Sequence, residues 1–305
     1  MLSETESQKI KIRQGHVTSP SKSEVTQHHL IEGKYIYCII AKDNCEPQTF
    51  GTIGIGGRGD ELYTISYNDI AAVVSNSPVK HYSIARENLI PHEHAIEEVM
   101  KTYTVLPVRF ATIAEDEEKV KKILEKEYDK ILNLLKNVEG KKELGFKAIF
   151  KEDIYNYILE KNQDIKALKE KLQNLPLGKT YYQRVEIGKM VEDALEKEKE
   201  IYKEDILNNL SPLAVETKIN NTYGERMIIN AAFFVEKNRE AEFDQKIQEL
   251  DAKYGDKVKF KYVGTLPPFN FVNLIIDTSI PLTNCGATSL PQRLRDKCRT
   301  TTGKY

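Results

Sequence analysis

One short stretch of the chain holds the residues with the greatest potential for chemistry, two histidines and two carboxylates. His92, Glu93 and His94 are adjacent, and Glu97 follows one helical turn after Glu93. Histidine and carboxylate side chains bind metals. On a helix, however, residues two apart point to nearly opposite sides, and the metal-binding His-Glu-x-x-His pattern needs a second histidine where this chain has Ile96. We therefore expect a histidine pair at a helix end with carboxylate neighbours, and neither a metal nor another cofactor.

Arg109 lies a few residues further on, within the apolar run VLPVRF. A guanidinium group beside an apolar strand needs a carboxylate partner, because burying it unpaired is costly. Glu93 and Glu97 are the candidate partners. No nucleophile or base stands at a diagnostic spacing, so the pattern favours a structural ion pair over a catalytic acid with an anion-binding arginine. A buried Arg109 predicts that Arg109→Ala destabilises the protein by about 2–4 kcal/mol.

These residues are expected to lie on a helix that leads into a strand. Apolar residues at helical spacing predict a helix from Ser83 to about Tyr103. The apolar residues from Val105 to Phe110 then predict a short strand. Pro107 interrupts it, and a proline inside a strand indicates an edge or a bulge.

A second notable segment lies near the end of the chain, where Pro267 and Pro268 precede Phe269, Asn270 and Phe271. Consecutive prolines enforce an extended backbone that cannot donate hydrogen bonds. We favour the interpretation that the two phenylalanines then pack this part of the chain onto a sheet. The alternative is that exposed aromatic rings bind a partner.

The glycine-rich segment GTIGIGGRG superficially resembles a phosphate-binding loop. It lacks the Gly-Lys-Ser/Thr ending of such a loop, and a strand rather than a helix is expected after it. A flexible loop is therefore favoured over a nucleotide site.

The rest of the pattern predicts an α+β fold in two domains. Strands are expected at 34–41, 61–66, 69–75, 144–150, 213–219, 226–235, 258–263 and 269–276, and helices at 116–138, 152–175, 180–210 and 238–254. From residue 144 onward, this order matches the βαββαβ order of a ferredoxin-like fold, with the first crossover lengthened into a helical hairpin at about 151–210. We expect a small α/β domain at 34–140, a ferredoxin-like domain at 141–276, a disordered arm at 1–33 and a polar tail at 277–305.

Composition excludes several classes of function. The 305 residues carry a net charge of −1 with 30% charged side chains, which gives no electrostatic case for nucleic-acid binding. No apolar run approaches the roughly 18 residues of a membrane span, and the first residues lack the apolar core of a signal peptide. The four cysteines show no Cys-x-x-Cys spacing, and Cys38 is expected to be a buried thiol in a strand. We therefore expect a cytoplasmic protein without structural disulfides.

Two of these segments resemble a known family. The pattern H-x-x-x-E followed by VLPVRFAT is similar to the N-terminal motif of the gas vesicle protein F/L family, and YVGTLPPFNFV is similar to its C-terminal motif. The resemblance extends from Lys34 to Ile276. Two differences are Ala111, where the family usually has glycine, and Thr265-Leu266, where many members have Pro-Trp; the F and L types are not distinguished.

The resemblance implies the same two-domain fold and a non-catalytic role. It implies an accessory or minor structural protein of gas vesicle assembly, associated with gas vesicles. Its implied partners are the small hydrophobic major shell protein and other accessory proteins, and its implied role is to help nucleate or build the shell. The alternative is a ligand-binding protein or enzyme on a ferredoxin-like scaffold, because that fold hosts many functions. A pocket with converging polar groups near Arg109 would favour this alternative.

Overall fold

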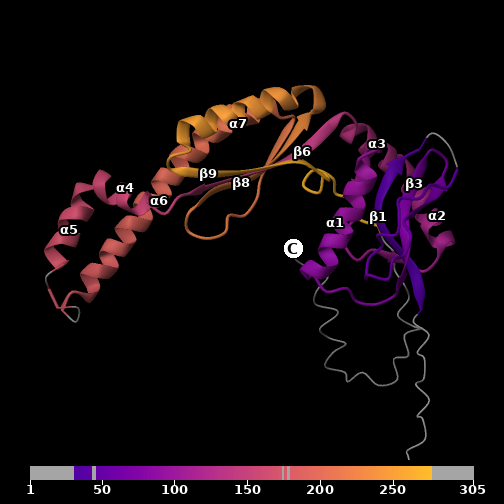
Figure 1. The fold of residues 1–305 in the computed structure, drawn as a ribbon, viewed down its shortest axis with the longest axis horizontal. Coiled ribbons are helices and arrows are strands. Elements are labelled where there is room, and N and C mark those ends of the chain that lie inside the picture. The colour runs from indigo at the N-terminus through magenta and orange to yellow at the C-terminus, as the bar shows by residue number, and fades with distance from the viewer. Residues whose placement is uncertain (1–30, 43–45, 174, 177–178, 277–305) are drawn as a thin grey trace, which may run out of the picture. The chain divides into compact units, whose positions relative to one another are not determined.

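The computed structural model describes residues 31–42, 46–173, 175–176 and 179–276, and it is an α+β structure with two antiparallel sheets (Figure 1). The expected polar tail, three of the four cysteines and nearly all of the expected arm lie outside the described residues. Glu32 and Gly33, which were expected in the arm, belong instead to the first strand.

The first sheet contains strands β1 (Glu32–Ala41), β2 (Tyr63–Tyr67), β3 (Ile70–Pro78), β4 (Val105–Pro107) and β5 (Ile113–Ala114). Its order is β2-β3-β1-β4, and β5 also pairs with β1. The two strands expected at 61–66 and 69–75 are β2 and β3, which form a hairpin that turns at Asn68, where φ is 50°. Pro107 lies opposite Cys38 at the end of the short strand β4, as the prediction of a strand-edge proline requires.

Helices cover both faces of this sheet. Helix α1 (Arg86–Met100) packs on one face, and α2 (Glu117–Lys126) and α3 (Tyr128–Val138) pack on the other (Figure 1). Alternate residues of β1 therefore enter two different cores: Tyr35 and Tyr37 lie with α1, and Ile36 and Ile39 lie with α2 and α3. Burial from both sides explains why β1 is a continuous apolar run, and Cys38 within it is a buried free thiol.

Two of the predicted helices are each interrupted once. The expected helix at 116–138 divides into α2 and α3 at Glu127, and the expected helix at 152–175 divides at Asn162 into α4 (Ile154–Lys161) and α5 (Gln163–Gln173). The first break lets α2 contact β2 and β3 while α3 contacts β1 and β4. Gly140 ends this helical region in the left-handed conformation, with a φ of 73°.

The second sheet contains β6 (Lys141–Phe150), β7 (Glu216–Ile219), β8 (Met227–Glu236) and β9 (Val258–Leu266), in the order β7-β8-β6-β9. Every neighbouring pair is antiparallel. Helices α6 (Tyr181–Leu210) and α7 (Glu240–Tyr254) contact strands β8 and β9, and Figure 1 shows α7 along one face of this sheet. Short 3-10 turns (Ser211–Leu213 and Lys237–Arg239) precede β7 and α7.

Residues 267–276 do not form the further strand that the sequence predicted. Pro267 and Pro268 cannot donate to a sheet, and a turn follows them in place of a ladder. The segment instead packs through Val272 and Leu274 against the core beneath α2 and α3, which Phe234 of β8 also joins. Among the described residues, no helix is both long and apolar enough to cross a membrane.

Candidate functional site

His92 lies in the centre of the region that the sequence selected. It is 2% exposed, and four aromatic rings surround it. Its ring centroid lies 5.7 Å from Tyr35, 5.8 Å from Tyr37, 5.5 Å from Phe110 and 6.3 Å from Phe269. We call these five residues the His92 cluster. The cluster corrects the prediction of a helix-end histidine with carboxylate neighbours, because His92 faces the sheet while His94 is exposed on the other side of α1.

The hydrogen bonding of His92 is incomplete. Its Nδ1 lies 3.1 Å from the Tyr35 hydroxyl, which in turn accepts a hydrogen bond of 2.9 Å from the backbone N–H of Ala111. The Nε2 atom is buried without a partner in the described part of the chain. Burial lowers the pKa of His92 to about 4, although the nearby backbone of Val108 acts in the opposite direction. The imidazole is therefore neutral at neutral pH.

The Pro-Pro-Phe-Asn-Phe motif is held by a buried carboxylate on β6. Glu143 accepts hydrogen bonds from the backbone N–H of Asn270 (2.9 Å) and from its side-chain amide (2.6 Å). Burial raises the pKa of Glu143, whereas these two hydrogen bonds lower it. Phe271 stacks on Phe234 with 4.8 Å between the ring centroids and 16° between the planes, and Lys218 donates to the Asn270 carbonyl.

These contacts support the packing interpretation of this motif. Pro267 and Pro268 are buried, and Phe271 packs on Phe234 of β8. Phe269 belongs to the His92 cluster and remains 42% exposed. The two motifs are more than a hundred residues apart in sequence, and they meet at His92 through Phe110 and Phe269. We call this region the junction. Sequence reasoning missed Glu143 because a single carboxylate in a strand gives no signal until its distant partner Asn270 is known.

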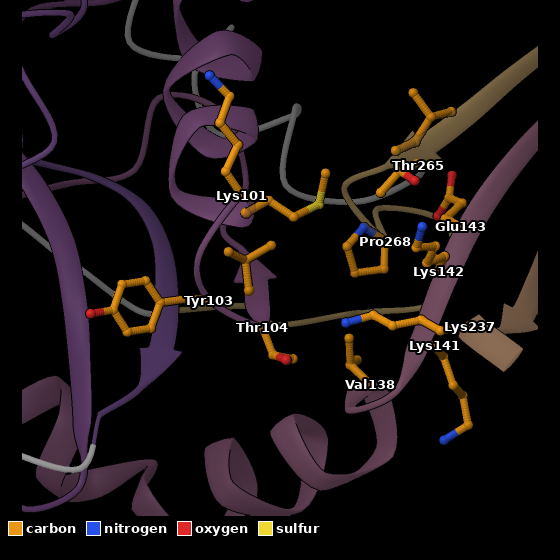
Figure 2. A pocket seen from close by; sticks show the side chains of 13 residues that line it. Lys101, Tyr103, Thr104, Val138, Lys141, Lys142, Glu143, Lys237, Thr265 and Pro268 are labelled. Carbon is orange, nitrogen blue, oxygen red and sulfur yellow. The ribbon is translucent and has the colours of Figure 1, made fainter.

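A cleft lies beside this junction (Figure 2). It has a volume of about 380 Å³ and is lined by residues from the α1–β4 connection, from the start of β6 and from the Pro-Pro motif. Lys237 extends into the cleft toward Thr104, whereas Lys141 points away from it. Lys142 forms an ion pair of 2.6 Å with Glu240. The cleft combines basic and apolar groups, and its one carboxylate among the described residues, Glu143, already accepts two hydrogen bonds.

The predicted burial and pairing of Arg109 are wrong. β4 ends at Pro107, so Arg109 falls in the turn that follows, where its side chain is exposed and forms no ion pair with a described carboxylate. Glu93 and Glu97 are exposed on α1, and the pKa of Glu93 is raised by partial burial and then by the charge of Glu97. None of these three residues lines the cleft beside the junction.

Two further features bear on chemistry. Within the described residues, no group of three or more His, Cys, Asp or Glu side chains is placed to hold a metal ion. The glycine-rich loop, in its described part, is bound to the first sheet more closely than a flexible loop would be. Ile55 is fully buried and its N–H donates to the Tyr37 hydroxyl (2.7 Å), while Arg58 bonds to Glu32 and Asp60.

Comparison with known proteins identifies the family. The family model described as gas vesicle synthesis protein GvpL/GvpF matches residues 33–273, which include both motifs and every residue of the junction. The chain belongs to this family. The predicted resemblance, made on the two motifs, is thereby confirmed.

Members of the GvpL/GvpF family with curated names include gas vesicle protein F of Dolichospermum flosaquae, 25% identical over 245 residues, covering 79% of this chain and 97% of the relative. Gas vesicle protein F1 of Halobacterium salinarum is 24% identical over 250 residues, covering 81% and 96%. Crystal structures of GvpF from Anabaena sp. PCC7120 and from Microcystis aeruginosa superpose with TM-scores of 0.68 and 0.63, at 24% and 23% identity. They cover 80% and 79% of this chain and 99% of their own chains, and they share its α+β fold.

Proposed function

We propose that this protein takes part in gas vesicle formation as a non-catalytic accessory protein. In this proposal it acts in the cytoplasm in association with gas vesicles, binds the hydrophobic shell protein and other accessory proteins, and helps nucleate or build the shell. The observation that carries the proposal is the match of residues 33–273 to the gas vesicle synthesis protein family. Relatives named gas vesicle protein F, aligned over nearly their full lengths, support it.

We also propose two domains, at 34–140 and 141–276, the second being a modified ferredoxin-like domain. The order β7-β8-β6-β9 supports this, because it is the order of a βαββαβ fold in which the third strand lies between the first and second. Helices α4, α5 and α6 occupy the first crossover, and α4 and α5 both pack against α6. This supports the proposed helical hairpin at about 151–210.

We propose that the shell protein binds to an exposed surface of the helical hairpin. Near its turn, Tyr181, Tyr182 and Val185 at the start of α6 are exposed by 66%, 84% and 56%. Leu175 is also exposed nearby. We call these four residues the hairpin patch. Clustered exposed tyrosine and aliphatic side chains are typical of protein-binding surfaces, because aromatic residues contribute much of the energy at interfaces.

The residues that the sequence analysis selected have two proposed roles. Pro107, Phe110, Pro267, Pro268, Phe269 and Phe271 maintain the junction. Glu93, Glu97 and Arg109 are exposed on or beside α1, where we propose that they contribute to an interface with other accessory proteins.

Co-expression with the major gas vesicle shell protein tests this function. The full chain is tagged, and soluble shell protein that co-purifies with it is measured for the wild type and for a Tyr181→Ser/Tyr182→Ser/Val185→Ser variant. We expect the shell protein to co-purify with the wild type and to be largely lost from the variant. Ile201→Ser is the matched control, because Ile201 is an exposed apolar residue elsewhere on α6.

Shell protein retained equally by the hairpin-patch variant would remove this surface from the proposal. Shell protein that does not co-purify with the wild type, either alone or with the other accessory proteins co-expressed, would contradict the proposed function itself.

A further inference from the structure

In the described part of the chain, α6 and α7 cover one face of the second sheet, and no helix covers the centre of the other face. Strand register shows which side chains lie on that second face. Leu144, Phe146 and Ala148 of β6 point into the core beneath α6 and α7. Since side chains alternate along a strand, Gly145 and Lys147 point to the opposite face. That face contains a hollow of about 630 Å³.

Small residues form the floor of this hollow. Gly145 of β6 lies opposite Ala232 of β8, and the Leu266 side chain of β9 packs beside Gly145, where an added Cβ would lie 3.0 Å from Leu266 Cδ1. Amide side chains stand around it, including Asn220, Asn230 and Asn270. Asn230 is nearly buried and donates to the Asn221 carbonyl (2.9 Å). Such a surface provides room for a bound backbone and both donors and acceptors for its peptide groups.

The charges around the hollow are unbalanced. Lys147 and Lys261 stand directly opposite each other on β6 and β9, and neither forms an ion pair with a described carboxylate. Like charges opposite each other in an antiparallel pair are destabilising. Among the described residues that line the hollow, the one carboxylate is Glu143, whose oxygens already accept hydrogen bonds from Asn270. An anionic ligand between the two lysines would relieve their repulsion.

We propose that this hollow binds an extended acidic segment of a partner protein, whose carboxylates lie between Lys147 and Lys261. In an extended segment, acidic residues at every second position all face the sheet. The amide groups of the hollow would then bond to its backbone. A single-stranded nucleic acid fits less well, because it needs several stacking rings, and among the described lining residues Tyr223 is the exposed aromatic one.

This inference concerns a different surface from the hairpin patch and does not depend on the proposed function. Its test uses the full chain and a defined probe, a fluorescein-labelled peptide of about ten residues that alternates Glu and Thr. At about 3.3 Å per residue, the peptide is long enough to cross the hollow. Fluorescence anisotropy at low ionic strength measures its affinity, and a Gln-Thr peptide of equal length controls for charge.

We expect the Glu-Thr peptide to bind the wild type and to bind Lys147→Gln/Lys261→Gln roughly tenfold more weakly. The matched control Lys189→Gln/Lys197→Gln removes the same charge from the exposed surface of α6 and should bind as the wild type does. Lys147→Glu separates folding from binding. It places opposite charges across the two strands, so the melting temperature should rise while peptide binding is lost.

Three results would overturn the proposal. The first is an absence of binding by the wild type. The second is equal affinity in the wild type and in Lys147→Gln/Lys261→Gln. The third is tighter binding of a single-stranded oligonucleotide or of inorganic polyphosphate than of the Glu-Thr peptide, which would assign the hollow to a phosphate-bearing ligand.

Discussion

Replacing Ala111 by glycine is expected to stabilise the protein. Ala111 has a φ of 63°, in the left-handed region, where an L-residue with a Cβ is strained by about 1–2 kcal/mol. Its methyl group is exposed, so removing it loses little packing, and glycine keeps the N–H that donates to Tyr35. Glycine raises the entropy of the unfolded chain, which costs about 0.4–1 kcal/mol. The net expected gain is about 0.5–1 kcal/mol.

Urea denaturation followed by circular dichroism measures this difference, with a higher midpoint expected for Ala111→Gly. The comparison is Ala214→Gly, because Ala214 has a φ of −101° and no strain to relieve, and its methyl group packs on the core of the second sheet. That variant should lose about 0.5–1 kcal/mol. If both substitutions destabilise the protein equally, the assignment of backbone strain to Ala111 is refuted.

Three other substitutions address the junction and its surroundings. Burial lowers the pKa of His92 from 6.5 to about 4. Between pH 6.5 and pH 4 the unfolded chain therefore binds a proton at this residue more readily than the folded chain does. The contribution of His92 to the free energy of unfolding should fall by about 2 kcal/mol from pH 7 to pH 5. His92→Phe should remove that part of the pH dependence. Thermal unfolding of the wild type and the variant at pH 7 and pH 5 measures it, and an equal loss of stability in both proteins would contradict the mechanism. Glu143→Ala leaves two Asn270 donors without an acceptor and should cost about 1–3 kcal/mol in urea denaturation, whereas Glu216→Ala, at an exposed position on the same sheet, should change stability by less than about 0.5 kcal/mol. Because Arg109 is exposed, Arg109→Ala should change the free energy of unfolding by less than about 0.5 kcal/mol. A loss of several kcal/mol would instead indicate a buried ion pair.

The sequence predicted the elements whose residue pattern is local. The buried strands β1 and β8, the long helix α6 and the turn at Asn68 follow from apolar runs, helical spacing and turn residues, and they lie close to the expected positions. The breaks at Glu127 and Asn162 were missed. Neither position carries a glycine or proline, and at Glu127 the break accompanies packing on two different sets of strands.

The sequence did not reveal the surroundings of the candidate residues. Both motifs do meet in the structure, yet Arg109 points to solvent and His92 to the core. Helical spacing placed His92 and His94 on different sides of α1, but it could not decide which side faced the sheet. The partners of His92 come from β1 and from the Pro-Pro motif, so the aromatic cluster is a product of contacts distant in sequence.

The composition of the core beneath α2 and α3 has a consequence for synthesis of the chain on the ribosome. The residues that β1 to α3 contribute to this core have all been synthesised once Val138 is added, but Phe234, Val272 and Leu274 belong to the same core. At about 5–20 residues per second, roughly 7–27 s separate translation of Val138 from that of Leu274. During this interval the nascent chain displays apolar surface that its own later residues will cover, which makes its early half prone to aggregation until Leu274 has been added.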